Sequence, residues 1–343
     1  MTNTRQLGFA VLVALAVVAA IGQPSPGAEA TTQAAIGQIE RADPRFDALI
    51  PRDAVLEKLA DGFEWSEGPV WVPDGAYLLF SDIPNNAVMK WKEGEGIRVF
   101  LKPSGYTGTP SRGGEPGSNG LVLDPVGRLV LCQHGDRRLV RVEKDGRWTT
   151  LADRYKGKRL NSPNDAVFKS NGDLYFTDPP YGLQGKDRET LGELGFCGVY
   201  RLGTDNRLTL LTDRMTRPNG IAFSPDEKTL YVANSDPKRA VWMAFAVTDD
   251  GLLGDGRVLH DVTKWVGKRE GLPDGMTVDR SGNLFATGPG GVNVFAPDGT
   301  LLGRIDPGQA TANCTFGDDG STLYVTADMF LCRIKTNTRG LGF

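Results

Sequence analysis

The sequence RPNGIAFSPDEKTLYVAN, residues 217–234, has the pattern of a loop, a strand, a tight turn and a second strand. Ile221 and Phe223 alternate with small residues, as expected of a half-buried strand. Residues 224–228, Ser-Pro-Asp-Glu-Lys, have turn chemistry, and residues 230–232, Leu-Tyr-Val, form an apolar run typical of a buried strand. This stretch therefore predicts two antiparallel strands joined by a tight turn.

The same unit recurs along the chain, and each copy begins with a carboxylate or amide residue that we call its head. The heads are Glu67, Asn119, Asn164, Asn219, Asp274 and Asn313. They are spaced by about 40 to 55 residues, which is the range of propeller blades and solenoid turns. Because repeats related by rotation put equivalent positions on a ring, we expect the heads to converge around one axis, at one mouth of the molecule.

Short apolar runs of period two follow each pair of strands, for example Val140-Arg141-Val142 and residues 199–202, Val-Tyr-Arg-Leu. Four antiparallel strands in each of six units predict an all-β fold, a six-bladed β-propeller around a central channel. Residues 55–59, which precede the first head, are expected to complete the last blade and close the ring, so that no sheet edge remains free. The propeller domain is expected to span residues 51–343.

The first residues predict a leader. Arg5 precedes an apolar run over residues 9–21, and Ala28-Glu29-Ala30 has the small-x-small pattern of a cleavage site. We expect a signal peptide over residues 1–30 and a flexible lead-in over 31–50, with an uncleaved anchor as the alternative. The protein would then be exported, periplasmic or secreted, with no stable membrane span after cleavage.

Composition and missing motifs exclude several classes of function. The formal net charge of −3 provides no basic groove for nucleic acid. The chain has no Gly-x-Ser-x-Gly elbow, no Walker loop and no strand followed by Gly-x-Gly-x-x-Gly, which argues against serine hydrolases of that type and nucleotide-binding folds. Its four cysteines are far apart and favour free thiols, although export would permit a disulfide. The sequence leaves the oligomeric state open.

The heads offer oxygen atoms as ligands. Glu67 and Asp274 provide carboxylates and the asparagines provide amide carbonyls, which suit a hard divalent cation. Ca²⁺ is expected first, with Mg²⁺, Mn²⁺ or Zn²⁺ as alternatives. A three-histidine zinc site is excluded because the chain has only two histidines. The alternative interpretation is structural, since Asn-Gly and Asp-Gly are common turn dipeptides.

Four motifs in order carry a family resemblance. They are Glu67-Gly68-Pro69, Ser162-Pro163-Asn164-Asp165, Arg217-Pro218-Asn219-Gly220 and Pro273-Asp274-Gly275. From about Leu56 to its end, the chain resembles the senescence marker protein/gluconolactonase (regucalcin-like) family of calcium-dependent lactonases. Residues 133–135, Gln-His-Gly, and 178–182, Asp-Pro-Pro-Tyr-Gly, are similar to the bacterial gluconolactonase branch.

The resemblance implies roles for particular residues. Glu67, Asn219 and Asp274 would hold the metal, and Asn164 would lie beside it and meet either the metal or the substrate. Asp274 would also be the general base. Animal members of the family carry an arginine where this chain has Ser162, so recognition of the sugar must differ.

The expected function is that of an exported, metal-dependent hydrolase of a sugar lactone. The metal would polarise the ester, and Asp274 would activate the attacking water. Asn119 and Asn164 would orient the substrate, His134 would donate a hydrogen bond to a sugar hydroxyl, and Tyr181 would also contact the substrate. Alternatives are a metal-dependent esterase or phosphotriesterase, or a non-catalytic propeller that binds a ligand or protein.

Two connections are much longer than hairpin turns, over residues 102–118 and 179–198. Long loops in compact domains are usually functional or disordered. Because both adjoin heads, we expect them to wall or cap the pocket.

Overall fold

The structure is a computed structural model that describes residues 35–343. The leader predicted over residues 1–30 lies outside the described residues. Within the described part, no helix is long and apolar enough to cross a membrane.

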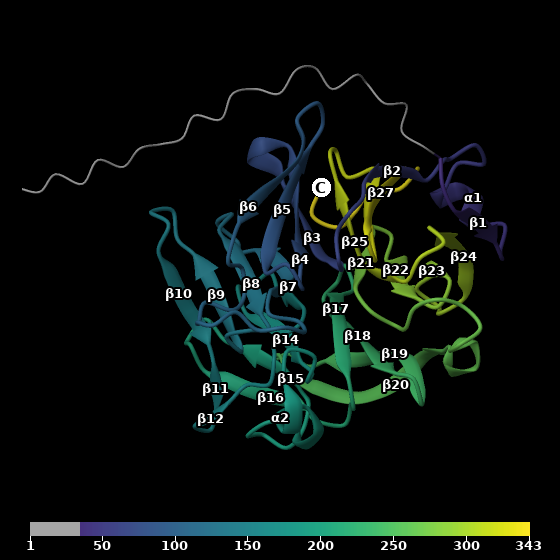
Figure 1. Ribbon diagram of the computed structural model, residues 1–343. Coiled ribbons are helices and arrows are strands. Elements are labelled where there is room, and N and C mark those ends of the chain that lie inside the picture. The colour runs from purple at the N-terminus through teal and green to yellow at the C-terminus, as the bar shows by residue number, and fades with distance from the viewer. Residues whose placement is uncertain (1–34) are drawn as a thin grey trace, which may run out of the picture. The chain divides into compact units, whose positions relative to one another are not determined.

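Six antiparallel blades are arranged in a ring, and each contains four strands that run outward from the central axis (Figure 1). The first three blades are β3 (Ser66–Val72), β4 (Tyr77–Asp82), β5 (Ala87–Lys92) and β6 (Gly96–Leu101); β7 (Ser118–Leu123), β8 (Leu129–Gln133), β9 (Arg138–Val142) and β10 (Trp148–Ala152); and β13 (Ala166–Phe168), β14 (Leu174–Asp178), β15 (Gly198–Leu202) and β16 (Leu208–Thr212). The next two are β17 (Pro218–Phe223), β18 (Thr229–Asp236), β19 (Arg239–Val247) and β20 (Leu253–Asp261); and β21 (Met276–Val278), β22 (Leu284–Gly288), β23 (Gly291–Phe295) and β24 (Leu301–Asp306). The six-bladed propeller predicted from the repeats is confirmed.

The last blade closes the ring with a strand from the other end of the domain. It contains β25 (Thr311–Gly317), β26 (Thr322–Ala327) and β27 (Phe330–Lys335), and its outer strand is β2 (Glu57–Ala60). β2 pairs antiparallel with β27, with Glu57 opposite Arg333. This pairing confirms the predicted closure and satisfies the edge of β27 with backbone hydrogen bonds.

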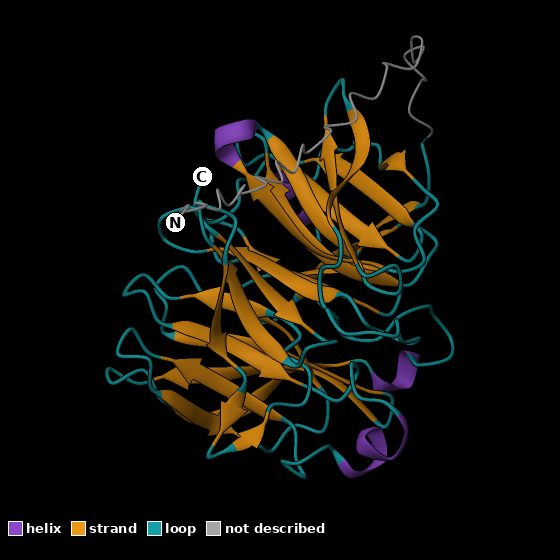
Figure 2. Cartoon of the chain, turned by 60° about the vertical axis from the view of Figure 1, so that its left-hand side comes forward, coloured by secondary structure: helices purple, strands orange, loops and turns teal. Residues whose placement is uncertain are grey.

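The few helices are short and lie outside the blades (Figure 2). Apart from α1, described below, they are α2 (Gly185–Thr190) and the 3₁₀ turns η1 (Pro73–Gly75) and η2 (Thr263–Trp265). α2 lies within the long connection after β14, and a small hairpin of β11 (Arg154–Tyr155) and β12 (Lys158–Arg159) precedes β13.

The cores lie between neighbouring blades. For example, Tyr175 and Val199 of the third blade pack with Ile221 and Val232 of the fourth. All four cysteines are buried as free thiols, as favoured from the sequence. Faces of adjacent sheets therefore bury each other, and no blade has a complete core of its own.

Part of the expected flexible lead-in is built into the fold. β1 (Gln38–Arg41) pairs antiparallel with β24 as a fifth strand, and α1 (Phe46–Leu49) follows it. Phe46 and Ile50 are fully buried in the core cluster shared by the last two blades. The expectation of a flexible segment is wrong for residues 38–50, because the outer edge of β24 was free to pair and these apolar side chains cover the core.

This packing predicts that Phe46 is a structural anchor. Replacing it with alanine (F46A) should lower the free energy of unfolding by about 3–5 kcal/mol, as for other buried phenylalanines. Val55, which is 47% exposed, provides the control, and V55A should change the free energy of unfolding by less than about 0.5 kcal/mol. Urea unfolding followed by tryptophan fluorescence measures both; equal stabilities of F46A and V55A would contradict the assignment.

Candidate active site

The innermost strands of the blades bring most of the heads together. Neighbouring inner strands contact one another around the axis. Five heads line a single cavity of about 490 Å³: Glu67, Asn119, Asn164, Asn219 and Asp274. Side chains more than 200 positions apart in the sequence therefore share one site, as rotational symmetry predicted.

The sixth head lies differently. Asn313 lines a separate cavity of about 630 Å³, together with Asp165. Its Nδ2 donates a hydrogen bond to Glu67 Oε2 at 3.2 Å. The expectation that all six heads face one mouth is wrong for Asn313, which instead supports Glu67 from the opposite side.

Buried hydroxyl groups link the heads of one blade to the next. Ser81 Oγ donates to the carbonyl oxygen of Asn119 at 2.7 Å, and Thr177 Oγ1 donates to that of Asn219 at 2.7 Å. The hydroxyls of Thr287 and Ser235 bond in the same way to Ala312 and Pro273 of the following blade. Each donor is the next-to-last residue of the second strand of its blade, so strand pairing and these bonds together set where the next head lies.

Hydrogen bonds to side chains of the second strand also hold the backbone just before a head. Asp178, at the end of β14, accepts hydrogen bonds from the backbone N–H of Ser162 at 2.7 Å and of Asn161 at 2.8 Å. Asn234 of β18 accepts one from the N–H of Arg217 at 2.9 Å. Side chains on the second strand thus orient the loops that lead into Asn164 and Asn219.

The glycine after a head allows neighbouring blades to approach closely. Asn219 and Gly220 lie within β17, and a Cβ added to Gly220 would lie 2.2 Å from the carbonyl oxygen of Asp274. The turn interpretation of this dipeptide is therefore wrong. Gly220 is required because a backbone carbonyl of the next blade occupies the space that a side chain would take.

The two carboxyl heads are poorly compensated by the chain. Glu67 is 2% exposed, and burial raises its pKa, against the partial effect of the Gly68 N–H that donates to Oε2 at 2.7 Å. Burial raises the pKa of Asp274 further, and the charge of Glu67 adds to the shift. Among residues 35–343, neither carboxyl has an ion pair with a basic side chain. The pair is therefore suited to a positive partner from outside the chain.

Several buried oxygens in the cavity have no hydrogen-bond partner. They are Oδ1 of Asn119, Asn164 and Asp274. Asn219 donates its Nδ2 to Ser235 Oγ at 2.9 Å, which uses its nitrogen end. Buried polar atoms are normally satisfied, so unpartnered oxygens beside two carboxyls fit a hard cation or a ligand rich in hydroxyls. The described residues contain no cluster of three histidine, cysteine or acidic side chains, so amide oxygens would have to complete a metal site.

The remaining predicted residues lie at different depths. Tyr181 lines the cavity, and burial raises its pKa. His134 does not line it: its side chain is fully buried and lies behind two residues that do, Asn164 and Glu115. Ser162, at the position of the animal arginine, donates to Pro179 O at 2.6 Å and accepts from Gly182 N at 2.9 Å. Ser162 therefore holds the 179–182 loop.

The long loops wall the cavity, as expected. Glu115 from the first loop and Tyr181 from the second both line it. The loops are joined by hydrogen bonds from Arg112 Nη2 to Gly182 O at 2.8 Å and from Gln184 Nε2 to Gly113 O at 2.7 Å.

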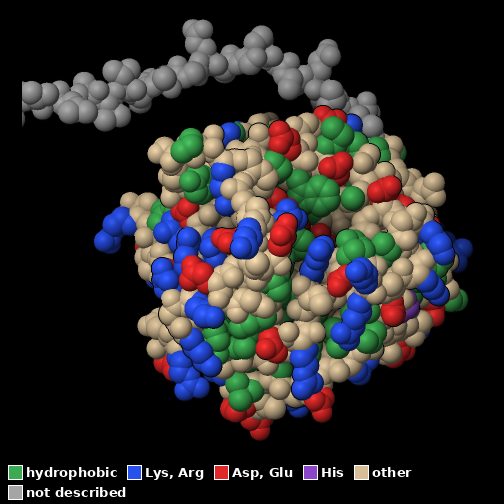
Figure 3. All heavy atoms as spheres, turned by 60° about the horizontal axis from the view of Figure 1, so that its bottom comes forward, with side chains coloured by type: hydrophobic (Ala, Val, Ile, Leu, Met, Phe, Trp, Pro, Cys, Tyr) green, Lys and Arg blue, Asp and Glu red, His purple; other side chains and the backbone are tan. Residues whose placement is uncertain are grey.

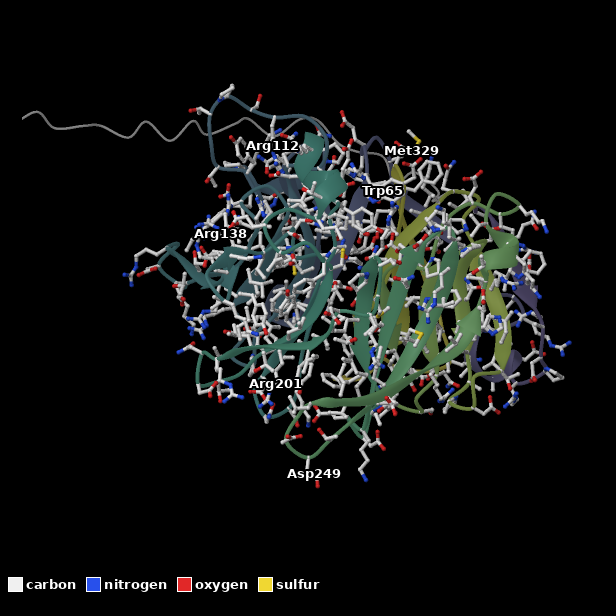
Figure 4. All side chains as sticks on the ribbon, turned by 90° about the horizontal axis from the view of Figure 1, so that it is seen from below. Trp65, Arg112, Arg138, Arg201, Asp249 and Met329 are labelled. Carbon is white, nitrogen blue, oxygen red and sulfur yellow. The ribbon has the colours of Figure 1, made fainter. Side chains whose placement is uncertain are left out.

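Sequence reasoning missed part of the wall. It did not assign Trp65, Glu115 or residues 266–272, which precede the fifth head. Trp65 and Arg112 lie on the same side of the molecule, away from Asp249 (Figure 4). The unusual length of the 262–273 connection was the sequence feature that could have identified these wall residues.

Lysine and arginine are interspersed with acidic side chains over the face in Figure 3, without a continuous basic surface.

Comparison with known proteins gives a consistent result. A family model described as the SMP-30/gluconolactonase/LRE-like region matches residues 65–328. The gluconolactonase of Zymomonas mobilis subsp. mobilis is 41% identical over 99% of both chains. Pentonolactonase XacC of Haloferax volcanii is 28% identical over 76% of this chain and 80% of its own. The solved structure of a gluconolactonase from Xanthomonas campestris has a TM-score of 0.77 and 36% identity, over 89% of this chain and 96% of its own.

A six-bladed propeller with this cavity and these relatives is a lactonase, a hydrolase of carboxylic esters. The chain belongs to the SMP-30/gluconolactonase/LRE-like family, whose model covers most of the propeller.

The buried carboxyl of Asp178, which holds the backbone before Asn164, predicts a measurable pH dependence of stability. Burial raises the pKa of Asp178 to about 7 in the folded state, from an ordinary value of 3.8. The folded protein therefore binds this proton more tightly than the unfolded chain does. The contribution of protonated Asp178 to the free energy of unfolding is thus complete below about pH 4 and is lost as the pH rises towards 7.

Asp178→Asn removes this titration. Between pH 4 and pH 7, the free energy of unfolding of the wild type should fall by up to about 4 kcal/mol more than that of the variant. Urea titrations at several pH values measure the difference, with the exposed Asp187→Asn as control. Parallel profiles of the wild type and D178N would contradict the assignment.

Proposed function

We propose that this lactonase opens a sugar lactone with the help of one bound divalent cation, Ca²⁺ first. Glu67, Asn164, Asn219 and Asp274 would hold the cation through their side-chain oxygens. The observation that carries the proposal is the set of unpartnered oxygens beside two buried carboxyls without a basic partner. When bound, the cation would supply positive charge that polarises the ester carbonyl.

The substrate class follows from the cavity and from the relatives. A volume of about 490 Å³ is suited to a small molecule. The unpartnered Oδ1 of Asn119 can accept a hydrogen bond from a hydroxyl group, and the rings of Trp65 and Tyr181 can cover the apolar face of a sugar. The Zymomonas relative is a gluconolactonase, which supports an aldonolactone.

Asp274 is proposed as the general base. Its carboxylate would take a proton from the water that attacks the lactone carbonyl carbon. The bond between that carbon and the ring oxygen then breaks, and the proton passes from Asp274 to the leaving ring oxygen, which gives the open hydroxy acid.

Substitution of the two carboxyls tests the proposal. Asp274→Asn should lower kcat about 10²- to 10⁴-fold on gluconolactone in the presence of Ca²⁺, which is the usual size of a general-base effect. Glu67→Gln should weaken calcium binding, measured by calorimetry, because it removes a charged ligand. The exposed Asp319→Asn is the matched control.

The outcomes separate the alternatives. Retained activity and retained calcium in D274N would remove Asp274 from the mechanism. Turnover of a phosphotriester or simple ester, with none of any lactone, would contradict the substrate class.

We also propose that the protein is exported, on the basis of the apolar run at residues 9–21 and the Ala-x-Ala pattern at 28–30. Expression of the full chain in a Gram-negative host should give a periplasmic form whose measured mass corresponds to a chain that begins near Thr31. A full-length protein found only in the cytosol would contradict export. Because residues 38–50 are packed, cleavage before them should leave the stability of the propeller unchanged.

A further inference from the structure

Three polar side chains from different blades and loops form a line that ends at the cavity. Glu115, in the loop before β7, has its Oε2 3.1 Å from His134 Nδ1, a close electrostatic contact that is not aligned as a hydrogen bond. On the other side of the same ring, His134 Nε2 lies 3.4 Å from Asn164 Nδ2. His134 is fully buried, whereas the side chain of Glu115 is 32% exposed and lines the cavity.

The contact with His134 determines which end of the Asn164 amide faces the cavity. The two ends of an amide have nearly the same shape, so packing alone does not choose between them. Here the Nδ2 end lies against His134 Nε2, and Oδ1 is buried without a partner. With Nδ2 held in this way, an oxygen rather than an N–H is presented to a cation or substrate.

That arrangement requires a particular histidine tautomer. Nδ2 can only donate, so Nε2 must accept and the ring proton must be on Nδ1. The group next to Nδ1 is the carboxylate of Glu115, which can only accept. The negative charge of a carboxylate 3.1 Å from Nδ1 favours a proton on that nitrogen, and so the Nδ1–H tautomer, in which Nε2 accepts from Asn164.

The surroundings keep both residues in place. The loop that carries Glu115 is tied to the second long loop through Arg112, whose Nη2 donates to Gly182 O. Gly182 itself packs on the histidine: a Cβ there would lie 2.6 Å from His134 Cβ. The backbone N–H of His134 donates to Gly117 O at 3.1 Å. The ring thus has little room to turn.

We propose that Glu115 and His134 are positioning residues, which hold the Asn164 amide with its oxygen directed into the cavity. Glu115 selects the tautomer of His134, and His134 fixes the amide. The consequence for turnover rests on the proposed function, but the tautomer does not depend on it. His134, expected from the sequence to contact the substrate, acts instead through Asn164.

The tautomer can be measured directly. The chain has only two histidines, so spectra of the full protein labelled with ¹⁵N histidine contain two ring systems, and His134→Gln assigns them. In the wild type, the nitrogen bearing the proton should be Nδ1 of His134. In Glu115→Ala, the population should shift towards the Nε2–H form. A wild-type proton on Nε2, or an unchanged spectrum in E115A, would overturn the proposal whatever the enzyme hydrolyses.

Kinetics test the second half of the proposal. Glu115→Ala and His134→Ala should each lower kcat/KM on gluconolactone by roughly 10- to 100-fold, the usual range for residues that orient a ligand side chain. Because they act in series, the double variant should be no worse than H134A alone. Additive losses would show that Glu115 acts independently of His134 and would overturn the proposal.

A rescue variant distinguishes positioning from general damage. In His134→Gln, the side-chain carbonyl can accept from Asn164 Nδ2 without a tautomer to select. H134Q should therefore recover most of the activity lost in H134A, and adding E115A to H134Q should change kcat/KM less than twofold. Failure of H134Q to exceed H134A would count against the role of His134 as an acceptor.

The control addresses the loop. Thr107 lies in the same loop as Glu115 and donates from Oγ1 to Asp136 Oδ2 at 2.7 Å. Thr107→Val removes the hydroxyl bond and keeps only the backbone bond from residue 107 to Asp136, but it leaves Glu115 opposite His134, so it should leave the tautomer and kcat/KM unchanged. A loss in T107V equal to that in E115A would show that loop anchoring, and not the contact with His134, is responsible.

Discussion

The site depends on hydrogen bonds that pass from one blade to the next near the central axis. Each blade is an ordinary antiparallel sheet, and sheet pairing alone does not place one blade relative to its neighbour. Ser81 and Thr177 do so by donating to the carbonyl oxygens of the next heads, Asn119 and Asn219. The hydroxyls are buried, so breaking such a bond would leave unsatisfied polar groups and would be strongly unfavourable. The ring is therefore rigid where the functional side chains begin.

This rigidity makes an unfavourable electrostatic arrangement possible. Glu67 and Asp274 are buried close together, and burial raises the pKa of both. In a flexible site, the two carboxyls would separate or turn towards water. Here the backbone bonds at the heads and the support of Asn313 from below keep them in place. The folding energy of the blades thus maintains a site whose two carboxyls disfavour each other's charge.

The repeat pattern predicted the propeller, its closure by residues 55–59 and the convergence of five heads, because all three follow from symmetry and alternation of apolar residues. It did not predict that Asn313 would face the other cavity, although Asn313 is followed by Cys314 where four of the other heads are followed by glycine. Residues 38–50 were misjudged because the pairing of residues 38–41 with β24 and the burial of Phe46 and Ile50 join segments far apart in the chain. Glu115 carried no repeat signal, as it lies in an irregular loop that only the tertiary structure brings to the cavity.

The blades and the loops therefore have separate roles. The repeated heads supply the oxygen donors, and equivalent positions in any six-bladed relative would lie in the same ring. The loops are not repeated, and they determine what surrounds that ring. Ser162 illustrates this division: its hydroxyl donates to Pro179 O and accepts from Gly182 N, and thereby holds the loop that carries Tyr181 beside the cavity. The side chain at that position therefore serves the loop and not the ring of heads, so what surrounds the oxygen donors is set by segments that the repeat does not contain.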